Sequence, residues 1–241
     1  MFSPNIFKKK SKGDAERPFW ISYADLMTAM MTLCLVAMAV TILAMNQELK
    51  RELSGEEVRA KEIRDVCDSI KNNLKNVSAI HVNCTDNRID FGEAGRFDYN
   101  GYRLKPEAEG YLGMLVPVVL EAASSDVGKK WLKQVVIEGY TDTQGPYLYN
   151  LYLSLQRSYW VMCALVDTKR NSNMSLTDNQ IQMVRRIFLA GGVSFNDPKN
   201  SAAESRRVEL RLQFYSRAEK ESGDEVSPPK IIASKQDACQ L

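Results

Sequence analysis

The sequence lacks the residues from which most enzyme active sites and metal centres are built. It has a single histidine, His81, which stands in a strand-like run without cysteine or histidine partners, and its five cysteines do not show metal-ligand spacing. It contains no nucleophile triad and no phosphate-binding loop. We therefore expect no catalytic residue, no metal site and no resident cofactor, and we interpret His81 as structural.

Charge is balanced over the whole chain and missing from one part of it. The 32 basic and 30 acidic residues nearly cancel, so the chain shows no nucleic-acid footprint. Twenty consecutive residues, Leu26 to Met45, carry no charge. At about 1.5 Å of helical rise per residue, they span a hydrocarbon core of ~30 Å. The sequence therefore predicts one transmembrane helix over residues 18–45.

The alternative for this apolar segment is a cleaved signal peptide, because Ala37 to Ala39 resembles a cleavage site. The apolar run continues to Met45, beyond the usual core of about 7–15 residues, which favours an uncleaved anchor. Five basic residues precede the helix, namely Lys8, Lys9, Lys10, Lys12 and Arg17. Basic residues are retained in the cytoplasm. We expect a single-pass protein of the bacterial inner membrane, with residues 1–17 as a cytoplasmic tail and the remainder periplasmic.

Three further regions follow the predicted membrane helix. Residues 46–77 carry one apolar stripe at three- and four-residue steps, which predicts a periplasmic linker helix. Residues 78–215 alternate strand-like and helix-like segments, which predicts a sheet covered by helices on one face. We expect Pro117 to kink or interrupt the helix that begins near Pro106. Residues 216–241 have too few apolar side chains to bury and are predicted to form a disordered tail.

The cysteines leave two possibilities open. Cys34 lies in the predicted membrane helix and Cys239 in the polar tail, so Cys67, Cys84 and Cys163 remain in a compartment where disulfides persist. A Cys67–Cys84 bridge and unpaired buried thiols are both compatible with this distribution.

Asp25 is an unusual residue for the mouth of a membrane helix. At 100° per residue, Thr32 lies within about 20° of it, and Ser22 and Thr28 lie about 60° to either side. A buried carboxylate either pairs with a cation or takes up a proton, and this span has no lysine or arginine. We predict that Asp25, with Ser22, Thr28 and Thr32, binds an ion. A carboxylate at the water interface of a helix start is the alternative.

The segment W-x-x-x-YAD-x-MTAMM, from Trp20 to Met31, resembles the transmembrane signature of bacterial flagellar stator B-subunits, the MotB family. This resemblance implies that Asp25 is the ion-binding residue. It also implies a homodimer inside a pentameric ring of MotA-like A-subunits, in which ion passage drives rotation of the ring. Protons are the expected ion, with sodium as the alternative.

A second pair of charged residues lies in the exterior region. Asp142 follows a predicted strand, and Arg157 lies fifteen residues later in a helix predicted from about Tyr147 to Asp167. A carboxylate and a guanidinium over one groove suit a zwitterionic amino acid such as diaminopimelate, and a surface salt bridge is the alternative. We expect one face of this helix to pack on the sheet and the opposite face, with Asn150, Ser154 and Arg157, to point toward the loop of Asp142. The residues of the expected buried face are Leu148, Tyr152, Leu155, Tyr159 and Met162.

The motifs GYTD, YN-x-x-LS-x-x-R and RRVEL resemble the OmpA-like peptidoglycan-binding domain, from about Phe97 to Phe214. This resemblance implies an α+β fold of βαβαβ type, with a mixed sheet and helices on one face. It also implies that the diaminopimelate of the peptidoglycan stem peptide is the ligand. Ser205 stands where the family usually has asparagine, which makes contacts from that turn less secure. The implied binding residues are Asp142 and Arg157, with Tyr149, Asn150 and Leu153 shaping the groove and Arg206 and Arg207 as the later arginine pair.

The short connector distinguishes between motor types. About 34 residues separate Met45 from Ile80, fewer than in flagellar B-subunits, and this compact form resembles the B-subunits of Zorya antiphage defence systems. The expected function is therefore that of the B-subunit of an ion-driven motor, anchored to peptidoglycan and acting in antiviral defence. A flagellar stator B-subunit and a passive peptidoglycan-tethered anchor without ion flux are the alternatives.

Overall fold

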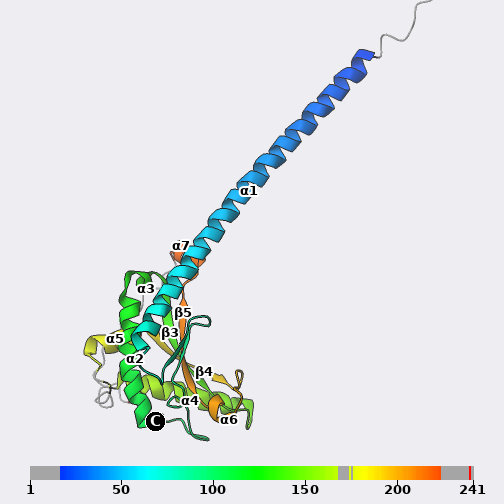
Figure 1. Cartoon of the computed structure of the whole chain (residues 1–241). Helices are drawn as coiled ribbons and strands as arrows, with labels where there is room; N and C mark the ends of the chain where they lie inside the picture. Colours follow the sequence, from blue (N-terminus) through cyan, green and yellow to red (C-terminus); the bar gives the residue numbers. More distant parts are fainter. Residues whose placement is uncertain (1–16, 168–173, 175, 224–238, 240–241) are drawn as a thin grey trace, which may run out of the picture. The chain divides into compact units, whose positions relative to one another are not determined.

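The computed structural model describes residues 17–167, 174, 176–223 and 239, with side chains from Tyr23 onward (Figure 1). The predicted cytoplasmic tail lies outside these residues except for Arg17. The chain divides into two compact units, Met1–Glu57 and Val58–Leu241.

One helix, α1 (Arg17–Leu74), covers both the predicted membrane helix and most of the predicted linker helix. The boundary between the two units falls inside α1, between Glu57 and Val58. Among the described residues, α1 is the one helix whose length and composition would allow it to cross a membrane. Its side chains from Tyr23 to Lys50 are all exposed, as expected for a helix that meets lipid or other chains rather than its own domain.

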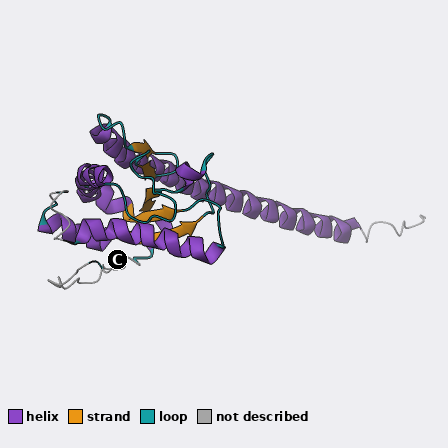
Figure 2. Cartoon of the chain, turned by 90° about the horizontal axis from the view of Figure 1, so that it is seen from below, coloured by secondary structure: helices purple, strands orange, loops and turns teal. Residues whose placement is uncertain are grey.

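The second unit contains a five-stranded mixed sheet, which confirms the predicted α+β fold class (Figure 2). The strand order is β1-β2-β5-β3-β4. Strands β3 and β4 are parallel, and the other neighbours are antiparallel. The strands are β1 (His81–Asn83), β2 (Arg88–Asp90), β3 (Leu132–Tyr140), β4 (Phe188–Ser194) and β5 (Val208–Phe214).

Apolar side chains alternate along the central strands, so one face of the sheet carries the core. Ile137 of β3 and Leu210 of β5 are fully buried there, together with Leu112 of α2 and Ile70 of α1. The opposite sheet face carries charged side chains such as Glu209. The remaining helices are α2 (Pro106–Ser124), α3 (Asp126–Trp131), α4 (Tyr147–Val166), α5 (Asp178–Ile187), α6 (Ala202–Ser205) and α7 (Arg217–Glu221).

Two local predictions need correction. An interruption of α2 at Pro117 is wrong, because apolar side chains such as Val116 and Val119 are held in the core on both sides of the proline and the helix runs through it. The chain after Ser216 does not begin as a disordered tail. The Ser216 side chain caps α7 in a capping box with Glu219, and Lys133 of β3 pairs with Glu219 at 2.6 Å, so local hydrogen bonds compensate for the missing apolar residues. Residues 224–238, 240 and 241 lie outside the described chain.

Two disulfides fix parts of the second unit. Cys67 of α1 is bonded to Cys84, so the first of the two possibilities for these cysteines is confirmed. A second bridge joins Cys163 of α4 to Cys239 in the polar tail, a pairing that the sequence does not predict. Cys34 is a free cysteine in α1.

Candidate functional site

Helix α4 packs on the sheet with the face opposite to the one predicted. Leu148, Tyr152, Leu155 and Tyr159 are exposed, whereas the polar face with Asn150, Leu153, Ser154, Arg157 and Ser158 is buried. The expected burial of the apolar face is therefore wrong for these four residues, whereas Met162, at the C-terminal end of that face, is partly buried against the core.

Two glycines explain this orientation of α4. A Cβ atom on Gly139 of β3 would lie 2.0 Å from the carbonyl oxygen of Ser154, and a Cβ atom on Gly192 of β4 would lie 2.5 Å from Ser154 Oγ. The helix backbone thus lies directly against the sheet, where only small side chains fit. The Ser154 hydroxyl is satisfied there, since it donates to Leu151 O at 2.7 Å and accepts from Ser194 N at 3.1 Å.

Arg157 lies on the buried face of α4, and its guanidinium reaches the C-terminal end of β3. Its guanidinium donates from Nε to Gly101 O at 2.8 Å, from Nη1 to Tyr140 O at 2.5 Å and from Nη2 to Asp98 O at 3.4 Å. It also lies 4.8 Å above the ring of Phe97. Burial lowers the pKa of Arg157 to about 10, although the nearby Asp142 carboxylate opposes the shift, so the side chain stays charged at neutral pH.

Asp142 pairs with Arg206 in place of Arg157. Asp142 Oδ2 accepts from Arg206 Nη1 at 2.8 Å, and Asp142 Oδ1 accepts from Gln144 N at 3.1 Å. Arg206 Nε also donates to Phe97 O at 3.2 Å. The topology brings these residues together, because β3 ends beside the beginning of β5 in the antiparallel ladder. The candidate site therefore consists of Asp142, Arg157 and Arg206 around Phe97.

The predicted groove residues take different positions. Asn150 is buried, and its Nδ2 donates to Gln144 O at 2.8 Å and to Pro146 O at 3.2 Å, so it shapes the loop after Asp142. Leu153 is buried on the face of α4 that packs on the domain. Tyr149 is exposed and lies beside Gly145, which has a positive φ of 93°. Leu153 thus contributes to the packing of α4, and a groove shaped by Tyr149 and Asn150 stays a prediction.

Arg207 is not part of this cluster. Its Nε donates to Glu209 at 2.6 Å, its Nη2 donates to Asp197 at 2.9 Å, and its guanidinium lies 4.0 Å above the ring of Tyr140. Arg88 pairs with the same Asp197 and Glu209. Burial opposes ionisation of Asp197, but Arg88, Lys199 and Arg207 lower its pKa. Arg207 thus belongs to an ion-pair network on the sheet face that carries Glu209.

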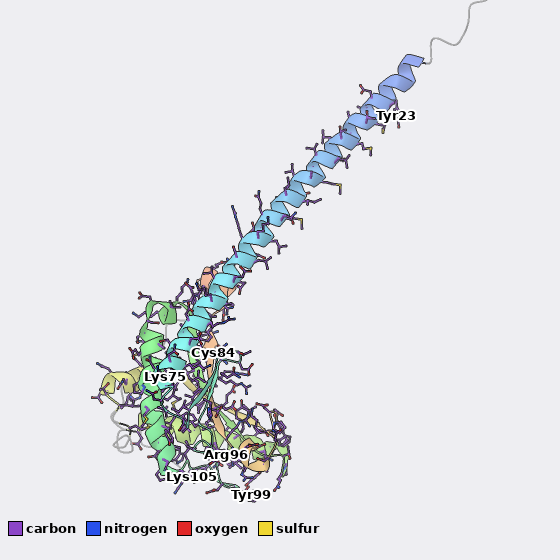
Figure 3. All side chains as sticks on the ribbon, in the orientation of Figure 1. Tyr23, Lys75, Cys84, Arg96, Tyr99 and Lys105 are labelled. Atoms are coloured by element: carbon purple, nitrogen blue, oxygen red, sulfur yellow. A yellow bond between two sulfur atoms is a disulfide. The ribbon has the colours of Figure 1, made fainter. Side chains whose placement is uncertain are left out.

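Sequence reasoning missed the segment Phe97–Gly101, whose carbonyl oxygens receive the Arg157 and Arg206 donors. It also missed Thr141, whose buried hydroxyl has no hydrogen-bond partner among the described residues and lies next to Asp142. The sequence FDYNG, with turn-forming Asn100 and Gly101, was the available signal for this loop. Figure 3 shows Arg96 and Tyr99 at the end of the domain that carries α6 in Figure 1, so the candidate site lies at this end.

The predicted ion-binding residues of α1 are exposed in the isolated chain. Thr28 Oγ1 donates to Asp25 O and Thr32 Oγ1 donates to Ala29 O, each at 2.9 Å. Both hydroxyl protons are used by the helix backbone, so each hydroxyl retains only acceptor capacity toward a proton or cation. Ser22 lies in the helix, but its side chain is outside the described ones. A closed ion site around Asp25 therefore requires groups from another chain.

Comparison with known proteins gives one close relative. The chain is 50% identical to the Zorya protein ZorB of Escherichia coli O139:H28 (strain E24377A / ETEC), over 97% of this chain and 95% of that protein. No protein-family model matches the chain.

Three similar solved structures are distant relatives. The peptidoglycan-associated lipoprotein from Burkholderia pseudomallei is 18% identical, with a TM-score of 0.32 over 50% of this chain and 87% of that one. The cell wall anchor of the T6SS from Pseudomonas aeruginosa is 17% identical, with a TM-score of 0.39 over 62% and 97%. The periplasmic domain of Helicobacter pylori MotB is 16% identical, with a TM-score of 0.36 over 56% and 80%.

Proposed function

The chain belongs to the Zorya protein ZorB family, and from this premise we propose that it is the B-subunit of an ion-driven motor of the bacterial inner membrane. The motor is anchored to peptidoglycan and acts in antiphage defence. One observation carries the proposal: the same chain has a single carboxylate, Asp25, in the apolar segment 18–45 of α1 and an aspartate–arginine site, Asp142 with Arg206, in its second unit.

We propose that the N-terminus is cytoplasmic and the second unit is periplasmic. The five basic residues before α1 support this orientation. The two disulfides, Cys67–Cys84 and Cys163–Cys239, support it independently, because disulfides persist in the periplasm and are rare in the cytosol.

In the proposed motor, two copies of α1 lie side by side inside a pentameric ring of MotA-like A-subunits. Asp25 takes up a proton from one side and releases it to the other, and sodium is the alternative ion. Each elementary charge that crosses the membrane releases about 2.3 kcal/mol per 100 mV. Neutralising Asp25 weakens its attraction to polar groups of the ring and ionisation restores it, so alternate loading of the two copies moves the ring stepwise.

The wall anchor uses the cluster at the end of β3. The Arg206 guanidinium, whose side chain is 19% exposed, is placed to bind the carboxylate of diaminopimelate in two positions. Asp142 accepts from the ammonium group of the same ligand. Arg157 is fully buried, so its main contribution is to hold the Asp98–Gly101 backbone and to add positive charge beneath the ligand.

The ion-binding part of the proposal is tested by Asp25→Asn. The variant chain is reconstituted with its A-subunit in liposomes, and proton flux is measured under an imposed potential. We expect a normal complex that conducts no protons, because an amide cannot exchange a proton at neutral pH. Flux at the wild-type rate in Asp25→Asn would show that Asp25 does not bind the ion, and a wild-type complex without flux would leave only a passive peptidoglycan tether. Thr41→Ala is the matched control, since its hydroxyl also donates to the helix backbone but lies far along α1 from Asp25.

The anchoring part is tested by Asp142→Asn in a co-sedimentation assay with purified peptidoglycan sacculi. We expect at least about a tenfold loss of affinity, equal to about 1.4 kcal/mol, because the charge that receives the ammonium group is removed. Asp86→Asn, an exposed aspartate in the turn between β1 and β2, is the control. Unchanged binding by Asp142→Asn would show that the anchoring site is elsewhere.

A further inference from the structure

The exposed face of α4 is apolar and aromatic to a degree that its own domain does not explain. Leu148 is 75% exposed, Tyr152 61%, Leu155 43% and Tyr159 42%. These four residues follow one another at steps of four, three and four, so they form a single stripe of ~16 Å along the helix. A contiguous exposed apolar surface of this kind usually marks a binding site. We call it the α4 stripe.

The α4 stripe carries no formal charge. Between Thr143 and Val166 the only charged residue is Arg157, which is fully buried on the other side of the helix. A surface for anionic lipid or nucleic acid would be basic, so both are disfavoured as partners. Tyrosine supplies a flat apolar ring and a hydroxyl group together, and the two stripe tyrosines, Tyr152 and Tyr159, lie on one side of the helix about 10 Å apart. This combination suits a ligand whose faces are apolar and whose edges carry neutral hydrogen-bonding groups.

Such a ligand would already be present at the neighbouring site. The α4 stripe begins at the N-terminal end of α4, where Asn150 holds the loop that follows Asp142. In peptidoglycan, a short peptide joins diaminopimelate to a sugar of the glycan strand. At about 3.5 Å per extended residue, this link spans roughly 10 Å. Leu148, the first residue of the α4 stripe, follows Asp142 by six residues, and Asn150 holds the loop between them, so the stripe begins next to the proposed stem-peptide site.

We propose that the α4 stripe is a second peptidoglycan subsite, which binds the neutral glycan strand while Asp142 and Arg206 hold the stem peptide. This inference rests on the proposed wall-anchoring function. Pyranose rings stack their C–H faces on Tyr152 and Tyr159, and the phenol groups hydrogen-bond to sugar hydroxyls and acetamido groups. Leu148 and Leu155 fill the spaces between the rings. Two-point attachment makes the second contact intramolecular, so a weak subsite adds substantially to retention on the wall.

The test uses the full-length chain in detergent and measures co-sedimentation with sacculi over a range of protein concentration. We expect Tyr152→Ala/Tyr159→Ala to weaken binding by about tenfold. Tyr152→Phe/Tyr159→Phe, which keeps the rings, should retain most of the affinity. Met114→Ala, a 53% exposed apolar residue on α2, is the control for loss of exposed apolar surface and should bind normally. All three positions are exposed, so thermal melting should be nearly unchanged in every variant.

A second probe separates the two subsites. Glycan strands stripped of their stem peptides by an amidase should bind the wild type weakly, should bind Asp142→Asn equally, and should not bind the tyrosine-to-alanine variant. Wild-type sacculus binding by the alanine variant, together with a loss in Asp142→Asn, would overturn the glycan subsite and leave the anchoring function intact. Normal binding by both variants would overturn the anchoring function itself. Normal sacculus binding by the alanine variant with reduced self-association in sedimentation velocity would assign the stripe to a second copy of the chain.

Discussion

Arg157 shows how a single buried charge can support a binding site without reaching the solvent. It is fully buried, and its guanidinium donates to the backbone carbonyls of Asp98, Gly101 and Tyr140. A buried acceptor that loses its donor costs about 1–3 kcal/mol, and hydrogen bonds to charged groups lie at the upper end. Arg157 therefore contributes mainly to the stability of the folded domain, and it supports binding through the backbone that it holds.

We predict that Arg157→Met destabilises the second unit by about 3 kcal/mol, because three carbonyl groups lose a charged donor. Thermal melting followed by circular dichroism measures the loss. Arg206→Gln is the matched comparison. Its side chain is 19% exposed and donates to two acceptors, Asp142 Oδ2 and Phe97 O, against three for Arg157, so this variant should cost less stability than Arg157→Met while weakening sacculus binding. Equal destabilisation by the two variants would contradict this division of roles.

The charged residues of the site could be found from the sequence, but their partners could not. Asp142 and Arg157 stand out by their motifs, and the structure places them in one cluster. The pairing of Asp142 with Arg206 depends on the register of β3 against β5, and the donors of Arg157 end on carbonyls of the loop around Phe97. Such choices depend on segments more than fifty residues apart, which no local pattern records.

At the scale of elements, α4 inverts the usual rule for amphipathic helices. A hydrophobic stripe normally faces the core, and this rule predicts burial of Leu148 and Tyr152. The sheet beneath α4 offers glycine at Gly139 and Gly192, so the closest packing is obtained with the small, polar side of the helix. The GG dipeptide in β4 was the sequence signal for this close approach, since glycine inside a strand often marks close backbone contact.

We predict that Gly192→Ala destabilises the domain by about 1–3 kcal/mol, because the new Cβ would lie 2.7 Å from Leu155 Cγ and 3.0 Å from Leu155 N. Gly191→Ala is a close control on the same strand. Its Cβ would meet only Val136 Cγ1 at 3.5 Å, an ordinary contact, and alanine should be neutral or slightly stabilising there. Urea unfolding of the two variants gives the comparison, and a smaller loss in Gly192→Ala than in Gly191→Ala would refute the packing argument.

Helix α7 is an element whose attachment should depend on pH. Hydrogen bonds from Lys133 and from Ser216 lower the pKa of Glu219 to about 2, against an ordinary value of 4.5. A carboxyl group with a depressed folded pKa stabilises the folded state fully above its unfolded pKa and loses this effect as pH falls through the folded pKa. The attachment of α7 should therefore weaken between pH 4.5 and about 2.

Hydrogen exchange of the α7 amides over this pH range measures the effect. We expect Glu219→Gln to exchange fast at all pH values, because the ion pair with Lys133 is absent throughout. Glu221→Gln is the control, since Glu221 is 70% exposed and pairs with Arg217 of the same helix. Protection of α7 that is independent of pH in the wild type would show that Glu219 does not hold it.

At the scale of the whole molecule, the chain combines a membrane-length helix with a domain that is tied covalently to the end of that helix. Arg59 donates to Tyr215 O at 2.9 Å, Glu62 pairs with Lys130 at 2.6 Å, and the Cys67–Cys84 bridge joins α1 to the turn after β1. Closing a loop of this size contributes about 3 kcal/mol in the chain-entropy model. A force applied at Asp142 and Arg206 would thus pass through the sheet to α1.

The predicted outline of the molecule followed from long, strongly patterned segments. The membrane-length helix, the helix from Tyr147 and the mixed sheet are all confirmed, because each rests on many residues that agree. The short elements α3, α6 and α7 were not predicted, since their stability comes from capping side chains and tertiary contacts rather than from periodicity.

The last prediction concerns the independence of the two proposed sites. Asp25 and Asp142 lie in different compact units, so a substitution at one site should leave the activity of the other site unchanged. In liposomes without peptidoglycan, the complex containing Asp142→Asn should conduct protons at the wild-type rate, because no wall contact is needed for charge transfer. Asp25→Asn should bind sacculi with wild-type affinity, because the wall site does not sense the membrane charge.

In cells, each variant should abolish defence. A B-subunit that is not anchored cannot resist the rotation of its ring, and an anchored chain without ion flux has no driving force. Loss of flux in Asp142→Asn would mean that the wall site and the ion site are energetically coupled, and the two-part motor would have to be replaced by a single switching unit.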